Sequence, residues 1–251
     1  MAFAAVPRVR SFWPDHPLTT IDPVTQEFLS HPGLFVVLEG GEGVGKTTQW
    51  QRLEDALTTL GHDVVAVREP GGTAVGDVLR KVLLDPESEL AAESEALLFA
   101  ASRAQLVQAV IRPALARNAI VLVDRFLLST YAYQGAGRGL PLDALRDTNR
   151  FATAGLAPDL TLLLTMPLEE ALARMKARGA ADRLERESVA FHSRVQTAFI
   201  EAAETAWQQC HPEIGPVYSI EASGSPDLVT MRCLQQLAAC CPTRFAGAVH
   251  E

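Results

Sequence analysis

The chain has 251 residues, of which 48% are hydrophobic and 21% charged, enough for one domain with a substantial core. Its formal net charge of −8 excludes a strongly basic surface, so we expect neither a nucleic-acid polymer nor an anionic membrane as a partner. No apolar run approaches the roughly 18 to 20 residues that span a bilayer. The four cysteines show neither a zinc-ligand spacing nor a disulfide framework, which predicts reduced thiols in the cytoplasm.

The first part of the chain, 1–33, holds five prolines among scattered charged and aromatic residues, with no sustained helical or strand period. Such a segment is typical of an extended or mobile arm. It has no apolar core of about 7 to 15 residues, which a secretory signal would need, and its acidic residues argue against an organelle transit peptide. We therefore predict an arm over 1–33 and one domain over 34–251.

A glycine-rich motif follows the first predicted strand, Leu34–Glu39, which is apolar up to its final acid. The motif reads Gly-x-x-x-x-Gly-Lys-Thr and precedes a predicted helix over 46–60, the context of a phosphate-binding loop, or P-loop. Main-chain N–H groups and the start of that helix would hold a triphosphate. Lys46 would bridge the β and γ phosphates, and the Thr47 hydroxyl would bind Mg²⁺. The expected ATP contacts are Gly40, Gly41, Glu42, Gly43, Val44, Gly45, Lys46, Thr47 and Thr48.

Two further predicted strands end in charged residues. The strand over 64–67 leads into Arg68 and Glu69, and the strand over 120–123 leads into Asp124-Arg125. Parallel strands present their C-terminal ends at one edge of a sheet, so these groups are candidates for phosphate contacts and, at Glu69, for metal-bound water. The alternatives are that Glu69 only forms a turn and that Asp124 and Arg125 form a structural ion pair.

A long helix is predicted over 92–118, with Pro113 kinking or interrupting it. Phe99 and Arg103 are four residues apart in this helix, so their side chains share one face. On composition alone, Phe99 would more often be a core residue than a platform for a base. The next segment, 126–139, is polar and aromatic with few aliphatic residues, which favours the lining of a site.

The rest of the chain continues to alternate strands and helices. Strands are predicted over 160–164 and 217–220, and helices over 142–155, 167–178, 188–210 and 226–240. This alternation predicts an α/β fold with a parallel five-stranded sheet and helices on both faces. Five basic residues crowd into 174–186, a positive cluster that would otherwise be a solvated helix face.

A P-loop occurs in ATPases, GTPases and small-molecule kinases, and the other motifs separate these classes. We find no Asn-Lys-x-Asp segment of the kind that reads guanine, and Asp124 precedes an arginine where an oligomeric ATPase usually has a second acid. Arg68, Arg125 and the basic cluster supply more cations than one triphosphate requires. The pattern indicates two phosphorylated ligands and favours a nucleoside monophosphate kinase.

Four ordered segments resemble the bacterial thymidylate kinases from about Leu34 to the last helix. The segments are 38–48, 68–73, 98–105, and Asp124-Arg125 with 129–135. The resemblance implies a P-loop nucleoside monophosphate kinase fold, phosphorylation of dTMP to dTDP by MgATP in dTTP biosynthesis, and a homodimer. It also implies a lid over about 174–187, and Gly43, where other members have an arginine, points to catalytic arginines in that lid.

Residue roles can be carried over from the same resemblance. Thymine would stack on Phe99 and receive a hydrogen bond from Arg103, with Thr130 and Gln134 as further contacts. Tyr133 would lie against the sugar and disfavour a ribose 2′-OH.

The resemblance also implies contacts for the phosphates and the metal. Arg68 and Arg125 would hold the acceptor phosphate, and Glu42 would lie near the 3′-OH and the Mg²⁺ assembly. The catalytic residues that it implies are Lys46, Glu42, Arg125, Arg178 and Arg183, and the predicted metal contacts are Thr47, Glu42 and Glu69.

Two other functions are kept open at this point. One is a kinase that acts on another nucleoside monophosphate, and the other is an ATP-binding regulatory module without turnover.

Overall fold

The computed structural model describes residues 31–179 and 181–245, and these form one structural unit. The predicted arm over 1–33 lies outside the described residues except for its last three, so it remains a prediction. In the described ranges we find no helix with the length and apolar character needed to cross a membrane.

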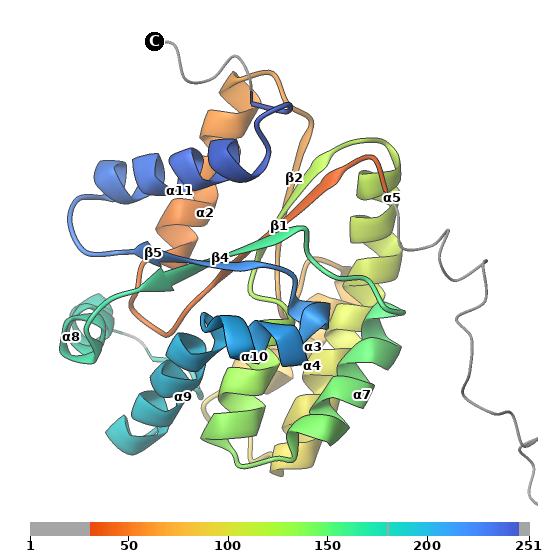
Figure 1. Ribbon diagram of the computed structural model, residues 1–251. Coiled ribbons are helices and arrows are strands. Elements are labelled where there is room, and N and C mark those ends of the chain that lie inside the picture. The colour runs from red at the N-terminus through yellow and green to blue at the C-terminus, as the bar shows by residue number, and fades with distance from the viewer. Residues whose placement is uncertain (1–30, 180, 246–251) are drawn as a thin grey trace, which may run out of the picture. The chain divides into compact units, whose positions relative to one another are not determined.

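Within the described residues, five parallel strands form one sheet in the order β2-β3-β1-β4-β5 (Figure 1). The strands are β1 (Leu34–Glu39), β2 (Val64–Arg68), β3 (Ile120–Asp124), β4 (Leu160–Thr165) and β5 (Val217–Glu221). The predicted parallel sheet is confirmed. The register pairs Asp124 with Leu38 on one side and with Arg68 on the other, so the charged ends meet at one edge as expected.

Helices cover both faces of this sheet (Figure 1). The side chains of β1 alternate between two apolar clusters because successive residues of a strand point to opposite faces. Phe35 and Val37 belong to the cluster built with α4, α7 and α9, whereas Val36 and Leu38 belong to the one built with α2 and α11. The helices are α2 (Lys46–Thr59), α3 (Ala74–Leu84), α4 (Ala92–Leu106), α5 (Arg112–Ala116), α6 (Leu127–Thr130), α7 (Leu142–Thr153), α8 (Leu168–Arg178), α9 (Val189–Ala202), α10 (Thr205–Cys210) and α11 (Pro226–Cys240).

In the part of the chain that the structure describes, three segments are helical but not α-helical: the π-helices Val107–Ile111 and Tyr131–Gly137 and the 3₁₀ turn Pro212–Ile214. The first π-helix joins α4 to α5 just before Pro113. A proline cannot donate the backbone hydrogen bond of a regular turn, and its ring crowds the preceding turn, so the helix widens there. The predicted interruption at Pro113 is confirmed.

Two predictions of secondary structure need correction. The helix expected over 188–210 is two helices, because Glu204 has an extended backbone (φ −74°, ψ 136°) that starts α10. Trp207 of α10 stacks on His211 with ring centroids 3.9 Å apart, and no glycine or proline in the sequence marks the break at Glu204. Sequence analysis also assigned no element to the residues of α3, which begins after Thr73, whose Oγ1 accepts a hydrogen bond from the Gly76 N–H.

Candidate active site

The P-loop connects β1 to α2, and its backbone packs closely against α8. Gly45 caps α2 in the left-handed conformation (φ 93°), and Gly43 is also left-handed (φ 77°). A Cβ added at Gly43 would lie 2.1 Å from the carbonyl oxygen of Ala171, which is far too close for any side chain. The helix that leads to the predicted lid therefore rests directly on the P-loop.

Lys46 is buried at the first position of α2, and its Nζ donates a hydrogen bond of 2.6 Å to the carbonyl of Gly41. Burial, followed by repulsion from Arg125, lowers the pKa of Lys46 to about 8. A group with that pKa is still mostly protonated at neutral pH. Lys46 is therefore a cation held inside the loop where phosphates would bind.

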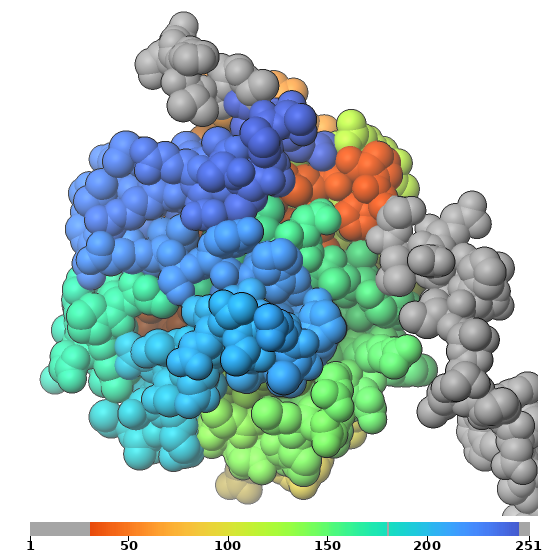
Figure 2. Space-filling view, in the orientation of Figure 1, coloured from red at the N-terminus to blue at the C-terminus, as the bar shows by residue number. Residues whose placement is uncertain are grey.

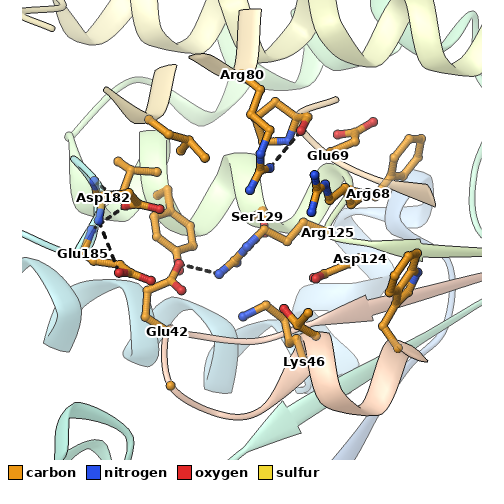
Figure 3. A pocket seen from close by; sticks show the side chains of 18 of the residues that line it. Glu42, Lys46, Arg68, Glu69, Arg80, Asp124, Arg125, Ser129, Asp182 and Glu185 are labelled. Carbon is orange, nitrogen blue, oxygen red and sulfur yellow. Dashed lines mark hydrogen bonds and ion pairs between the residues drawn. The ribbon is translucent and has the colours of Figure 1, made fainter. Parts of the chain in front are cut away.

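A cavity of about 370 Å³ opens beside the P-loop (Figure 3). The structure brings most of the predicted site residues into its wall. Those that line it are Glu42, Gly43, Gly45, Lys46, Thr47, Thr48, Arg68, Glu69, Phe99, Arg103, Arg125, Thr130, Tyr133, Gln134 and Arg178. Gly40 and Gly41 instead accept hydrogen bonds from Arg125 and Lys46, and the side chain of Val44 is buried in the apolar core.

A second cavity, of about 550 Å³, lies behind the P-loop between α8 and α9. Figure 2 shows a red segment of the P-loop at the floor of a hollow between these helices. No arginine or lysine is among the described residues that line this cavity, whereas several cations line the first. The cations around the P-loop therefore line the first cavity.

Three arginines from different elements point into that first cavity (Figure 3). Arg68 is the last residue of β2, and Arg125 follows β3. Arg80 extends from α3, and its Nη1 donates a hydrogen bond of 2.9 Å to the carbonyl of Pro70. Burial, and next the charge of Arg68, lower the pKa of Arg80. Sequence analysis missed Arg80, although a helix capped at Thr73 would have placed it two turns into the helix.

Arg125 is the centre of a small charged cluster at the ends of β1 and β3. Its backbone is left-handed (φ 71°), and its Nη1 donates to Gly40 O (3.0 Å) and Ser129 Oγ (3.1 Å). Its Nη2 pairs with Glu42 Oε1 at 2.5 Å, and the same oxygen accepts 2.8 Å from the Tyr133 hydroxyl. The guanidinium carbon lies 5.0 Å from the centroid of the Tyr133 ring. The predicted residues Glu42, Arg125 and Tyr133 thus form one interaction network.

Glu39, the last residue of β1, holds the turn that carries Arg125. It is fully buried, and its carboxylate accepts hydrogen bonds from Phe126 N (2.8 Å), Ser129 N (3.0 Å) and Ser129 Oγ (2.6 Å). Sequence analysis noted an acid at the strand end but gave it no role. Its partners are 87 and 90 residues away in the chain, so no local pattern could have identified them.

Arg103 is almost wholly buried, and all five of its N–H groups have acceptors inside the protein. Nε and Nη2 each lie 2.8 Å from Glu69 Oε2, and Nη2 also donates 3.0 Å to Phe126 O. Nη1 donates to Thr130 Oγ1 (3.0 Å) and Asn149 Oδ1 (2.6 Å). Arg103 therefore has a fixed position in the cavity wall, which the partly buried Phe99 also lines.

The predicted metal contacts differ in whether their side-chain oxygens already have partners within the protein. Glu42 is paired with Arg125, and Glu69 with Arg103, where burial raises the pKa of Glu69 to about 7 despite the arginine. Thr47 lines the cavity and is exposed. Asp124, also in the wall, has a buried Oδ1 without a hydrogen-bond partner among the described residues.

No group of three or more histidine, cysteine, aspartate or glutamate side chains that could hold a metal ion occurs within 31–179 and 181–245. A cation at this site would thus need oxygen ligands from a bound phosphate as well as from the protein. A hydroxyl and an unpaired carboxylate oxygen suit a hard cation. Thr47 offers the first, and Asp124 and Glu69 each offer the second, because the buried Oε1 of Glu69 also has no hydrogen-bond partner among the described residues.

The predicted lid contributes Arg174 and Arg178 to the cavity wall, but not Arg183. Arg178 is half-exposed and pairs with Glu185. Arg183, predicted to be catalytic, instead pairs with Glu95 Oε2 at 2.7 Å and donates 2.8 Å to the carbonyl of Leu83. The buried carboxylate of Glu95 therefore holds the Arg183 side chain outside the cavity wall in this structure, and its catalytic role stays a prediction. Within the lid range, Ala180 lies outside the described residues.

The Glu42 ion pair predicts a pH-dependent contribution to stability. Burial opposes ionisation, but Arg125 and then Lys46 lower the pKa of Glu42 to about 2, below the ordinary 4.5. The charged carboxylate therefore stabilises the fold above about pH 4.5, and this contribution is lost as the pH falls toward 2. We expect Glu42→Gln to lower the free energy of unfolding at pH 7 by up to about 3 kcal/mol.

Urea unfolding at a series of pH values from 7 to 3 measures this difference, with Glu93→Gln as the control for loss of an exposed acid. The stability gap between wild type and Glu42→Gln should narrow toward acid. A gap that keeps the same size across the range would show that the ion pair contributes no net stability.

Comparisons with known proteins agree with this geometry. The sequence model of the thymidylate kinase family matches residues 38–212. The chain is 54% identical to a thymidylate kinase of Desulforudis audaxviator over 68% of this chain and 78% of that protein. It is 50% identical to one of Deinococcus radiodurans (70% and 86% covered) and 48% identical to one of Synechococcus sp. (85% and 98% covered). The chain belongs to the thymidylate kinase family.

Proposed function

We propose that this chain transfers the γ-phosphoryl group of MgATP to dTMP, giving dTDP for dTTP synthesis. The observation that carries the proposal is the arginine set beside the P-loop: Arg68, Arg80 and Arg125 converge in the cavity that Lys46 borders. A P-loop already provides for one triphosphate, so these additional cations call for a second anionic group. Enzymes named thymidylate kinase at about half identity support dTMP as the second ligand.

The donor side of the site is the P-loop itself. Lys46 is buried and cationic, and the main-chain N–H groups at the start of α2 face the same space. Phosphoryl transfer passes through a loose transition state, so catalysis needs positioning and charge neutralisation more than covalent help. Lys46 would neutralise the β and γ phosphate oxygens while the loop holds them in line with the acceptor.

Mg²⁺ is the proposed cofactor, bound together with ATP. Its charge would neutralise phosphate oxygens during transfer. Thr47 offers an exposed hydroxyl, and Asp124 offers the unpaired buried oxygen already described. The carboxylate of Glu42 pairs with Arg125, and that of Glu69 pairs with Arg103 through Oε2. The Oε1 atom of Glu69 has no partner among the described residues and would be a further oxygen ligand.

The acceptor nucleotide would lie with its phosphate at the arginines and its base toward Phe99. In this arrangement the ring of Phe99 is the stacking surface, and Thr130 and Gln134 border the same end of the cavity. Arg103 already satisfies its donors within the protein, so its hydrogen bond to thymine would be shared with those acceptors. Tyr133, fixed by Glu42, would pack against the sugar.

We also propose a homodimer. α4 packs against both α3 and α7, and these three helices carry large apolar side chains that are exposed in the single chain. Phe151 of α7 is 90% exposed, and Val78 of α3 is 59% exposed. A second copy would cover this surface in a two-fold arrangement, in which each helix meets its own counterpart or neighbour.

The four cysteines are free thiols, which supports a reducing, cytoplasmic location.

A nucleotide panel tests the reaction. With MgATP, purified protein should phosphorylate dTMP faster than dCMP, dAMP or UMP, and removal of Mg²⁺ should abolish turnover. The thymine methyl group is worth about 1 to 3 kcal/mol, so dUMP should react about tenfold to a few hundredfold less efficiently. Faster turnover of UMP, CMP or AMP would indicate another monophosphate kinase. Binding of dTMP without formation of ADP would indicate a regulatory module.

Two lid arginines provide a matched test of the transfer step. Arg178→Ala should lower kcat by about 10²-fold or more with little change in the KM for dTMP, because its charge would act on the transferring group. Arg183→Ala removes a cation that lies outside the cavity, so we expect a lower melting temperature and a much smaller loss of kcat. Equal losses of kcat in two equally stable variants would place Arg183 in the catalytic group after all.

Sedimentation equilibrium tests the dimer. Phe151→Glu should shift the protein from dimer to monomer because a carboxylate would be buried without a partner in the interface. Met231→Glu, an exposed apolar site on α11 outside this surface, is the control and should remain dimeric. A wild-type monomer, or a Phe151→Glu dimer, would refute the proposed interface.

A further inference from the structure

Glu95 is a fully buried carboxylate that lines neither the cavity nor the P-loop. It lies on α4, one turn before Phe99 and two turns before Arg103, on the same side of the helix. Three side chains donate to it: Gln134 Nε2 to Oε1 (2.8 Å), Arg138 Nε to Oε1 (3.2 Å) and Nη2 to Oε2 (3.0 Å), and Arg183 Nη1 to Oε2 (2.7 Å). It therefore joins the predicted base pocket to the lid.

The charge state of this carboxylate is fixed by its surroundings. Burial opposes ionisation, but hydrogen bonds from Arg138, Gln134 and Arg183 keep the pKa of Glu95 below its ordinary value. A second acid, Glu187, pairs with Arg138 at 2.6 Å, so the cluster holds two carboxylates and two guanidinium groups. Glu95 is thus ionised at neutral pH, and an ionised carboxylate can only accept hydrogen bonds.

This restriction determines how the Gln134 amide is oriented. The amide has an NH₂ end that donates and an oxygen end that accepts, and only the NH₂ end can face an ionised carboxylate. Its oxygen receives no hydrogen bond from the described residues, while Gln134 itself lines the cavity. Because of Glu95, the part of the Gln134 amide that is available to the pocket is its acceptor oxygen. The amide cannot flip to present its NH₂ donor instead.

We infer that Glu95 is a positioning residue that sets base selectivity through Gln134. Thymine carries a ring N–H at N3, which an amide oxygen can accept. Cytosine has an unprotonated nitrogen at N3, whose lone pair would face that oxygen without a hydrogen bond. The inference rests on the proposed function, because it assumes that the base of the acceptor nucleotide occupies the Phe99 end of the cavity.

Steady-state kinetics with dTMP and dCMP test this role. In Glu95→Gln the residue at 95 can donate or accept, so the Gln134 amide is free to flip. We expect the ratio of kcat/KM for dTMP over dCMP to fall about tenfold or more, mostly through KM, since a lost or mismatched hydrogen bond is worth about one power of ten. Glu187→Gln, which removes an acid from the same cluster without touching Gln134, should keep the wild-type ratio.

A double-variant cycle separates positioning from a general structural effect. If Glu95 acts through Gln134, adding Glu95→Gln to Gln134→Leu should not change the dTMP to dCMP ratio further. A proportional loss for both nucleotides in Glu95→Gln, or additive effects on the ratio in the cycle, would overturn the inference. Wild-type protein that does not phosphorylate dTMP at all would instead overturn the proposed function.

A measurement on wild-type protein keeps the test independent of how the variants fold. dTMP methylated at N3 lacks the ring N–H and should be phosphorylated at least tenfold less efficiently than dTMP. A loss smaller than about threefold would show that no acceptor faces N3 and would refute the inference.

Discussion

The turn after β3 is the constraint on which this site depends. Arg125 has a left-handed backbone, which costs a non-glycine residue on the order of 1 kcal/mol or more, and several contacts hold it there. Its N–H donates 2.9 Å to Leu38 O of β1, its guanidinium binds Gly40 O, and Glu39 holds the two residues that follow the turn. The contacts that impose this strained backbone also join Arg125, a proposed contact of the acceptor phosphate, to the P-loop. In the proposed reaction, the sheet would therefore fix the distance between the donor and acceptor phosphates.

Burial of charge around the cavity has an energetic cost that the protein offsets with paired contacts. The Arg103 and Glu69 side chains are each 2% exposed, and removing one partner would leave the other charge buried alone. Such pairs contribute little net stability compared with apolar packing, but they keep long side chains in one geometry. For a reaction that depends on electrostatic positioning, a rigid arrangement of cations lowers the reorganisation needed during transfer.

Local patterns predicted the fold well and the site in part. The strands and the P-loop were found because buried runs and glycine spacing are visible within a few residues, and the boundaries of α11 followed from Ser225 and Pro226. The roles of Glu39 and Glu95 depend on partners 39 to 90 residues away, which a single sequence does not reveal. A charge run likewise shows where cations are, but not that Arg183 will pair with the buried Glu95.

The close contact between Gly43 and Ala171 limits which residue this chain can hold at position 43. With α8 seated on the loop, position 43 has no room for even a methyl group, so an arginine at that position would require α8 to move outward. Moving α8 would in turn carry Arg174 and Arg178 away from the cavity, since both belong to that helix. In this structure a side chain at position 43 is thus sterically incompatible with the present positions of Arg174 and Arg178.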